Sequence, residues 1–96
     1  MRLDLADLRL FMAIVDAGSI TQGAARAHLA LPSASERLRN MEASVGTPLL
    51  LRQPRGVLPT PAGEALAHHA RRLLQQHAHM QHELQAWSQG EQGTVR

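Results

Sequence analysis

Residues 18–46 of the chain read GSITQGAARAHLALPSASERLRNMEASVG, a stretch that predicts two short helices joined by a tight turn. We expect the first helix over Ile20 to about His28, opened by a capping-box pair of Ser19 and Gln22. Inside this helix Gly23 costs about 1 kcal/mol relative to alanine. Close approach of another helix is the simplest reason for a glycine at this position.

The second helix of the pair begins at Pro32, because proline is tolerated in the first turn of a helix, and continues to Val45 before Gly46. A helix that reads a DNA groove needs one anchored apolar side and one exposed side of small or hydrogen-bonding residues. An ordinary amphipathic surface helix has a similar pattern, so both interpretations are open at this point. The apolar side holds Ala34, Leu38, Met41 and Val45, and the remaining positions hold Ser33, Ser35, Glu36, Arg37, Arg39 and Asn40.

A helix is also predicted before this pair, with Asp4 as its N-cap and Gly18 just after its last residue, Ala17. Its apolar residues recur at helical spacing and form a broad face that we assign to the core. They are Leu5, Leu8, Phe11, Met12, Ile14 and Val15.

After the pair, residues 49–52 and 57–59 flank the short turn signal Gln53-Pro54-Arg55-Gly56. We interpret this segment as a small two-stranded wing with Arg55 at its tip. An arginine on a protruding tip suits insertion into a DNA minor groove, where the negative potential is strongest. A solvated arginine in a loop is the alternative interpretation.

A long helix closes the chain, capped by Thr60 with Pro61 at its first position. No helix breaker occurs over residues 64–89, which predicts a helix about 40 Å long, longer than the core of this domain can cover. Two interleaved sets of residues, each spaced seven positions apart, form the a/d seam of a coiled coil. Such a seam implies a partner helix and favours a homodimer. The seam consists of Leu66, Ala70, Leu73, His77, Met80, Leu84 and Trp87.

Composition sets limits on the class of protein. The 96 residues suffice for one domain, and with 44% hydrophobic but only 2% aromatic residues the core is aliphatic. The formal charge is only +2, but all ten basic residues are arginines, which favours forked contacts to phosphates and guanine edges. We expect Arg37, Arg39 and Arg52 to contact phosphates. The chain lacks cysteine and any membrane-length apolar run, so we expect a cytoplasmic protein without a membrane partner.

Five histidines lie on the last predicted helix: His68, His69, His77, His79 and His82. His79 and His82 could share a metal ion, whereas the alternative is a polar helix face with His77 in the seam, making association sensitive to pH. We predict neither a metal site nor a cofactor. Nothing resembles a catalytic constellation, since helix starts explain the serines, and we expect no enzyme activity.

With these elements in place, residues 3–63 resemble the N-terminal DNA-binding domain of LysR-type transcriptional regulators. The matching pattern is Leu8-Arg9-x-Phe11, Gly18-Ser19-x-Thr21, Ala24, Pro32, Ser35, Glu42, Gly46, Leu49, Arg52, Thr60 and Ala62-Gly63. The resemblance implies a mainly α, winged helix-turn-helix domain at residues 1–60. It further implies a dimerising linker helix at 61–89, and at 90–96 the start of a linker to an effector-binding domain that this chain lacks.

The resemblance also implies a set of DNA contacts, made by Pro32, Ser33, Ser35 and Glu36 on the recognition helix, by Arg55 on the wing, and by Thr21 near a phosphate. Three positions depart from the usual family pattern. Ala30 and Leu31 stand where Ser-Gln is usual, which removes a capping hydroxyl and leaves only apolar contact, for example with a thymine methyl group. Glu36 replaces a basic or amide residue and could accept a hydrogen bond from cytosine N4.

We therefore predict sequence-specific binding of double-stranded operator DNA by a bacterial-type dimeric regulator, with the recognition helix in the major groove and the wing in the minor groove. Family resemblance adds a small-molecule effector, bound outside this chain, and assembly that could extend to a tetramer. Two other functions remain open on the sequence: a helical module that binds protein through the same faces, and a metal-responsive module built on the histidines.

Overall fold

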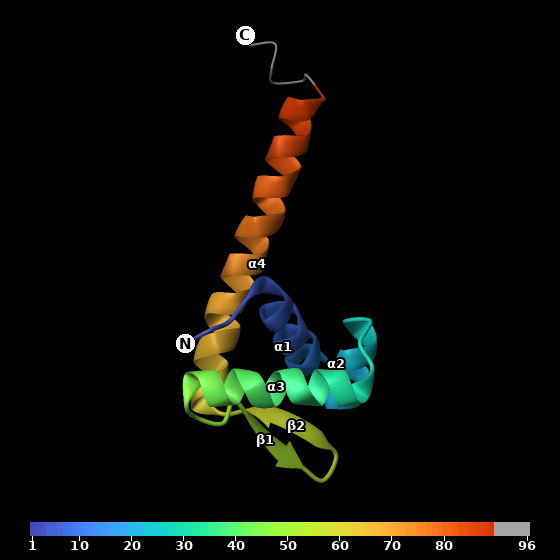
Figure 1. Cartoon of the computed structure of the whole chain (residues 1–96), viewed down its shortest axis with the longest axis vertical. Helices are drawn as coiled ribbons and strands as arrows, with labels where there is room; N and C mark the ends of the chain where they lie inside the picture. Colours follow the sequence, from blue (N-terminus) through green and yellow to red (C-terminus); the bar gives the residue numbers. More distant parts are fainter. Residues whose placement is uncertain (90–96) are drawn as a thin grey trace.

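The computed structural model describes residues 1–89, which form four helices and one two-stranded sheet (Figure 1). The predicted linker at residues 90–96 lies outside the described residues. In chain order the elements are α1 (Leu5–Ala17), α2 (Ile20–Arg26), α3 (Leu31–Val45), β1 (Leu50–Gln53), β2 (Gly56–Pro59) and α4 (Pro61–Ser88).

The start of α1 is fixed by a reciprocal capping box. The Asp4 carboxylate accepts a hydrogen bond from the Asp7 N–H at 2.8 Å, and the Asp7 carboxylate accepts one from the Asp4 N–H at 3.0 Å. At the other end Gly18 takes the left-handed conformation, with φ of 68°, and its N–H closes the last turn on the Ile14 and Val15 carbonyls. Both predicted ends of this helix are confirmed.

Helix α2 begins as predicted, but its capping differs. Ser19 Oγ accepts a hydrogen bond from the Gln22 N–H at 3.1 Å, which is half of a capping box. The Ser19 N–H, which the Gln22 side chain would take, instead donates to the Ile14 carbonyl at 3.3 Å. The helix ends at Arg26 rather than His28, because His28 adopts a positive φ of 61° in the turn to α3.

The close approach predicted at Gly23 is present, and the neighbour is α1. A Cβ atom at this position would lie 2.5 Å from the Ile14 Cα and 2.6 Å from its side chain. A glycine is therefore required here by helix packing, which explains its place in a helix interior.

Small shifts at other boundaries have local causes. Helix α3 starts at Leu31, one residue before Pro32, because the Ala30 carbonyl already accepts the Ala34 N–H at 3.0 Å. Strand β1 starts at Leu50, since the Leu49 N–H donates to the Glu42 carboxylate at 2.7 Å instead of to a strand. The wing is the predicted antiparallel pair, with Leu50 opposite Pro59. Both strands extend one residue further than predicted, because Gln53 and Gly56, which the sequence placed in the turn, pair with each other in the sheet.

Helix α1 lies at the centre of the core. Helices α2 and α3, the wing and the base of α4 pack around it. Phe11 and Ile14 of α1 are completely buried, as is Ala34 of α3. From α4, Ala67 and Ala70 are buried in the same cluster. This arrangement is the predicted winged helix-turn-helix with a long final helix.

Beyond this core, α4 continues alone. The helix has 28 residues, which at 1.5 Å per residue give a length of about 42 Å. Figure 1 shows its C-terminal part rising away from every other element. The principal extents of 57 × 24 × 18 Å reflect this overhang.

Candidate nucleic-acid interface

The two sides of α3 differ in the way that a groove-reading helix requires. Ala34, Leu38 and Met41 are at most 5% exposed and fix the helix to the core. On the outward side Ser33, Glu36 and Arg39 are exposed, and Pro32 is exposed at the first turn. Ser35, also a predicted DNA contact, and Arg37 are half-buried. The anchored side therefore holds in place an exposed side of small and hydrogen-bonding residues.

The N-terminus of α3 lacks a side-chain cap. Ala30 is the N-cap residue and makes no capping hydrogen bond, as expected from the missing hydroxyl. Leu31 follows it with 43% of its surface exposed. The start of this helix thus presents an apolar side chain and uncapped backbone amides to solvent, at the end where recognition helices contact DNA.

Thr21, the predicted phosphate neighbour, is exposed in the first turn of α2. Ser19 caps this turn and Ile20 anchors it in the core at 9% exposure. The hydroxyl of Thr21 is consequently carried at the start of a well-anchored helix.

Arg52 and Arg55 of the wing are both exposed. Arg55 is in the turn between β1 and β2, as predicted, and Arg52 is in β1 opposite Val57. Neither arginine has an ion-pair partner among residues 1–89. Both guanidinium groups are therefore available to a phosphate or a groove.

The wing is tied to the rest of the domain at three points, which the sequence did not reveal. The Val57 N–H donates to the Gly18 carbonyl at 3.0 Å. Beside it Gly56 has a φ of 135°, and a Cβ atom there would collide with the same Gly18 carbonyl. On the other side the Glu42 carboxylate accepts the Leu49 and Leu50 N–H groups, at 2.7 and 3.3 Å. These contacts fix the wing relative to the helices.

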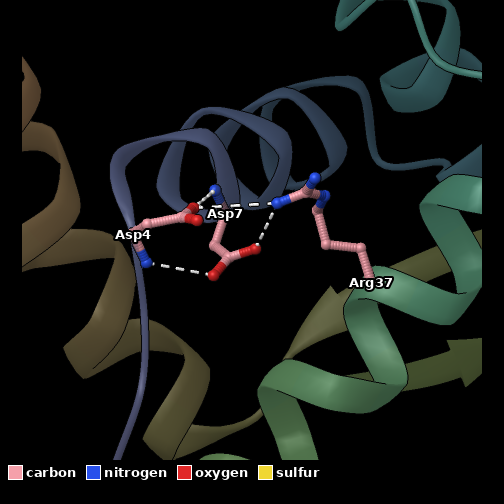
Figure 2. A network of polar contacts seen from close by, with 3 residues as sticks. All are labelled: Asp4, Asp7 and Arg37. Carbon is pink, nitrogen blue, oxygen red and sulfur yellow. Dashed lines mark hydrogen bonds and ion pairs between the residues drawn. The ribbon is translucent and has the colours of Figure 1, made fainter.

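Arg37 is directed towards the N-terminus of α1 (Figure 2). Its Nη1 atom lies 2.8 Å from Oδ1 of Asp7 and 3.7 Å from Oδ1 of Asp4. The hydrogen bond from the Asp7 N–H, reinforced by the Arg37 charge, lowers the pKa of Asp4 below its ordinary value of 3.8. The sequence pointed to a phosphate contact for Arg37, and neither of its two acidic partners was anticipated.

The predicted dimer seam divides into two parts along α4. Its first residues serve the domain itself, because Ala70 is completely buried and Leu66 packs against the core. On a single chain Ala70 is therefore inaccessible to a partner helix. His77 is half-buried, with Nδ1 3.5 Å from Nη2 of Arg9. The exposed part of the seam consists of Leu73, Met80, Leu84 and Trp87, each of which is 43–57% exposed.

The histidines of α4 do not form a cluster of metal ligands within residues 1–89. Over residues 1–89, no three histidine, aspartate or glutamate side chains come close enough together to hold a metal ion. His68 and His69 meet edge to face with ring centroids 5.1 Å apart. Within the same residues, no helix combines the length and hydropathy that crossing a membrane requires.

Fold and surface together define a winged helix-turn-helix domain: a core-anchored third helix, a two-stranded wing with exposed arginines and a long final helix. The family model of the bacterial regulatory helix-turn-helix protein, lysR family, matches residues 5–64. This match covers more than half of the chain, which therefore belongs to the LysR family and is a LysR-type helix-turn-helix DNA-binding domain.

Similar curated proteins are transcriptional regulators. The HTH-type transcriptional regulator AbaB of Streptomyces antibioticus is 47% identical over 68 residues, which are 71% of this chain and 23% of AbaB. The nitrogen assimilation regulatory protein nac of Escherichia coli (strain K12) is 45% identical over 69 residues, 72% of this chain and 23% of that protein. The chain thus spans about a quarter of the length of these relatives.

Solved structures share the fold over nearly the whole chain. The BenM_DBD in its complex with catB site 1 DNA matches with a TM-score of 0.86 and 31% identity, covering 93% of this chain and 96% of that one. The CbnR_DBD in its complex with DNA gives 0.80 and 30%, covering 90% and 99%. The long α4 helix is thus part of the shared architecture.

Proposed function

We propose that this chain binds double-stranded DNA in a sequence-specific manner as a homodimer, with α3 in the major groove and the wing in the minor groove. The observation that carries the proposal is the division of α3: an apolar side at most 5% exposed, and an outward side that exposes Ser33, Glu36 and Arg39. The 31% identical BenM_DBD, solved with DNA, has the same fold and supports this reading.

Each predicted contact has a role suited to its place. Pro32, Ser33, Ser35 and Glu36 would meet base edges or nearby backbone from α3, with Leu31 against a thymine methyl group. Thr21, Arg39 and Arg52 would meet phosphates, and Arg55 would enter the minor groove. Because several phosphates would be neutralised, binding should weaken steeply as salt rises.

The exposed residues of the seam support the dimer part of the proposal, since they lie on the overhang of α4, where no other element of residues 1–89 covers them. They are Leu73, Met80, Leu84 and Trp87. We propose that the chain acts by binding DNA and not as a catalyst.

A bacterial DNA-binding protein works in the cytoplasm, where the chromosome lies. A small-molecule effector and a tetramer would involve the rest of a longer regulator, and they stay predictions from family resemblance.

A gel-shift titration tests DNA binding directly. Purified protein is titrated against a library of duplexes at salt concentrations from about 50 to 200 mM, with the slope of log affinity against log salt as the readout. We expect retarded complexes and a steeply negative slope. Absence of retardation at every salt concentration would contradict the proposal and favour the protein-binding alternative.

A wing variant tests the second half of the contact surface. Arg55→Ala should weaken binding to a selected site by about tenfold, which corresponds to 1.4 kcal/mol, because it removes the cation from the tip of the wing. Arg72→Ala, which removes an exposed arginine from α4, is the charge-matched control and should bind like the unaltered protein. Equal affinity of the Arg55 variant and the control would show that the wing makes no contact.

A further inference from the structure

We infer that Arg37 is a positioning residue that Asp4 and Asp7 withhold from DNA, so that this acidic clamp sets how well the domain discriminates its operator from other DNA. The inference rests on the proposed function, and it differs from the phosphate contact that the sequence suggested for Arg37. It depends on three observations: the ion pairs of Arg37, the charges around it, and the hydrogen bonds that hold its partners.

The ion pairs join two elements that are distant in sequence. Nη1 of Arg37, from the middle of α3, lies 2.8 Å from Asp7 and 3.7 Å from Asp4 at the start of α1. Figure 2 shows the guanidinium pointing across the gap between the two helices. Asp7 is well covered, with 13% of its side chain exposed, against 38% for Arg37. This partial shielding strengthens the pair relative to one in open solvent.

The partners are themselves held in place. Asp4 and Asp7 accept each other's N–H groups in the capping box of α1, at 2.8 and 3.0 Å. Their carboxylates are therefore already oriented when Arg37 meets them, and little side-chain freedom remains to be lost on that side of the pair. The start of α1 thus acts as a rigid anchor for the middle of α3.

The surroundings of Arg37 disfavour phosphate. A cavity of about 560 Å³ between α1 and α3 is lined by three carboxylates, of Asp4, Asp7 and Glu36, and by the two guanidinium groups of Arg2 and Arg37. Against the single positive charge of Arg2, the three carboxylates leave a formal excess of two negative charges around Arg37, or of one when Arg37 itself is counted. Because Asp7 and Asp4 occupy Nη1, a phosphate oxygen would have to bind the other N–H groups of Arg37 and approach this negative charge.

Release of Arg37 would place a free cation close to the bases. Ser33 precedes Arg37 by four residues and borders the same cavity, so the two side chains lie one above the other on α3. A freed arginine could swing to the backbone beside Ser33 and bind any DNA, because phosphate contacts carry no sequence information. The clamp therefore raises specificity by keeping this cation occupied.

Neutral variants that keep the capping hydrogen bonds can separate the two roles of Arg37. Asp7→Asn removes the charge but leaves an amide oxygen that can accept the Asp4 N–H, and Asp4→Asn keeps a good N-cap residue. Asp16→Asn is the matched control for the single Asp7→Asn variant, since each removes one acid from α1 and Asp16 pairs with Arg71 of α4 instead of with Arg37. Affinity for a selected operator and for a scrambled duplex is measured across about 50–200 mM salt.

In the Asp4→Asn/Asp7→Asn protein, the slope of log affinity against log salt on scrambled DNA should become steeper by about one. As salt falls from about 200 to 50 mM, its affinity for scrambled DNA should therefore rise roughly threefold more than that of the unaltered protein, and its specificity ratio should fall. Arg37→Gln should lower affinity for the operator without changing the slope, whereas Arg39→Gln should reduce the slope by about one. Adding Arg37→Gln to the double asparagine variant should abolish the steepening. Asp16→Asn should match the unaltered protein.

A reduced slope in Arg37→Gln would overturn the inference, because it would show a direct phosphate contact. So would an unchanged slope and specificity ratio in the double asparagine variant, once circular dichroism shows that it is folded. Either result leaves the proposed function standing if the unaltered protein still prefers its operator. Loss of all DNA binding by the unaltered protein would instead contradict both proposals.

Discussion

Single residues in this domain are determined by what their backbone and nearest neighbours permit. Gly23 is the clearest example, because the space for its side chain is taken by Ile14 of α1. The sequence predicted a close approach from the cost of a glycine within a helix. It did not identify the neighbour as α1, since residues nine positions apart are brought together only by the turn at Gly18.

Gly23→Ala should therefore destabilise the domain by about 1–3 kcal/mol through overpacking, even though alanine is the better helix former by about 1 kcal/mol. Urea denaturation followed by circular dichroism measures the change. Ala25→Gly, at an exposed position of the same helix, calibrates the helix-propensity contribution alone. Greater stability of the Gly23 variant would mean that α1 and α2 are less tightly packed than described.

Asp4 gives a prediction about pH. The Asp7 N–H and then Arg37 lower the pKa of Asp4, so its carboxylate stabilises the fold above pH 3.8, and that contribution disappears as the pH falls through the lowered pKa. The melting temperature should therefore fall less in Asp4→Asn than in the unaltered protein between about pH 5 and pH 3. Identical losses in the two proteins would contradict a contribution from Asp4.

At the scale of elements, the ends of helices were predictable wherever a local signal sets them. Asp4, Gly18, Gly46 and Thr60 all act where the sequence placed them, because a cap depends on residues three or four positions away. The start of β1 was less predictable, because a side chain seven positions away, the Glu42 carboxylate, takes the Leu49 N–H and delays the strand by one residue.

In helix α4, periodicity alone cannot distinguish residues that pack in the domain core from residues that could face a partner helix. The heptad pattern gives Ala70 and Leu84 equivalent places in one seam, yet Ala70 is fully buried in the domain and Leu84 is 57% exposed. The difference arises from how far the core reaches along α4, which depends on where α1 packs. Only the exposed part of the seam, from Leu73 onward, can meet a partner helix.

Leu84→Glu should accordingly convert the proposed dimer into a monomer, since it would place a charge in an apolar helix-helix contact. Sedimentation equilibrium over a range of protein concentrations measures the dissociation constant. Gln75→Glu adds the same charge on the side of α4 away from the seam and should leave the dimer intact. Equal effects of the two variants would show that the exposed apolar residues of α4 do not form the interface.

At the scale of the whole molecule, the protein is more extended than a compact domain of its length. Its radius of gyration is 16.3 Å, whereas a compact domain of this length is expected near about 12 Å. The excess reflects the overhang of α4, which in a two-fold dimer would hold two recognition helices at a fixed separation. Such a dimer reads half-sites about one helical turn, or a multiple of it, apart.

Sequence alone was sufficient for the fold class and the family, because the capping residues and turn signals are local and the family pattern, with Gly18-Ser19 within it, occurs in register. The orientation of Arg37 was not predictable. Its partner Asp7 lies 30 positions away, and an exposed arginine beside predicted DNA contacts has the same pattern whether it binds phosphate or an acid. Only the packing of α1 across α3 decides between them.

Sequence-specific DNA binding is tested most directly by the specificity ratio of the purified chain. A site is selected from a randomised duplex library, and its affinity is compared with that of a scrambled duplex of equal length and composition at about 150 mM salt. We predict a two-fold symmetric selected site bound at least about a thousandfold more tightly than the scrambled duplex. Equal affinity for the two duplexes would contradict sequence-specific DNA binding.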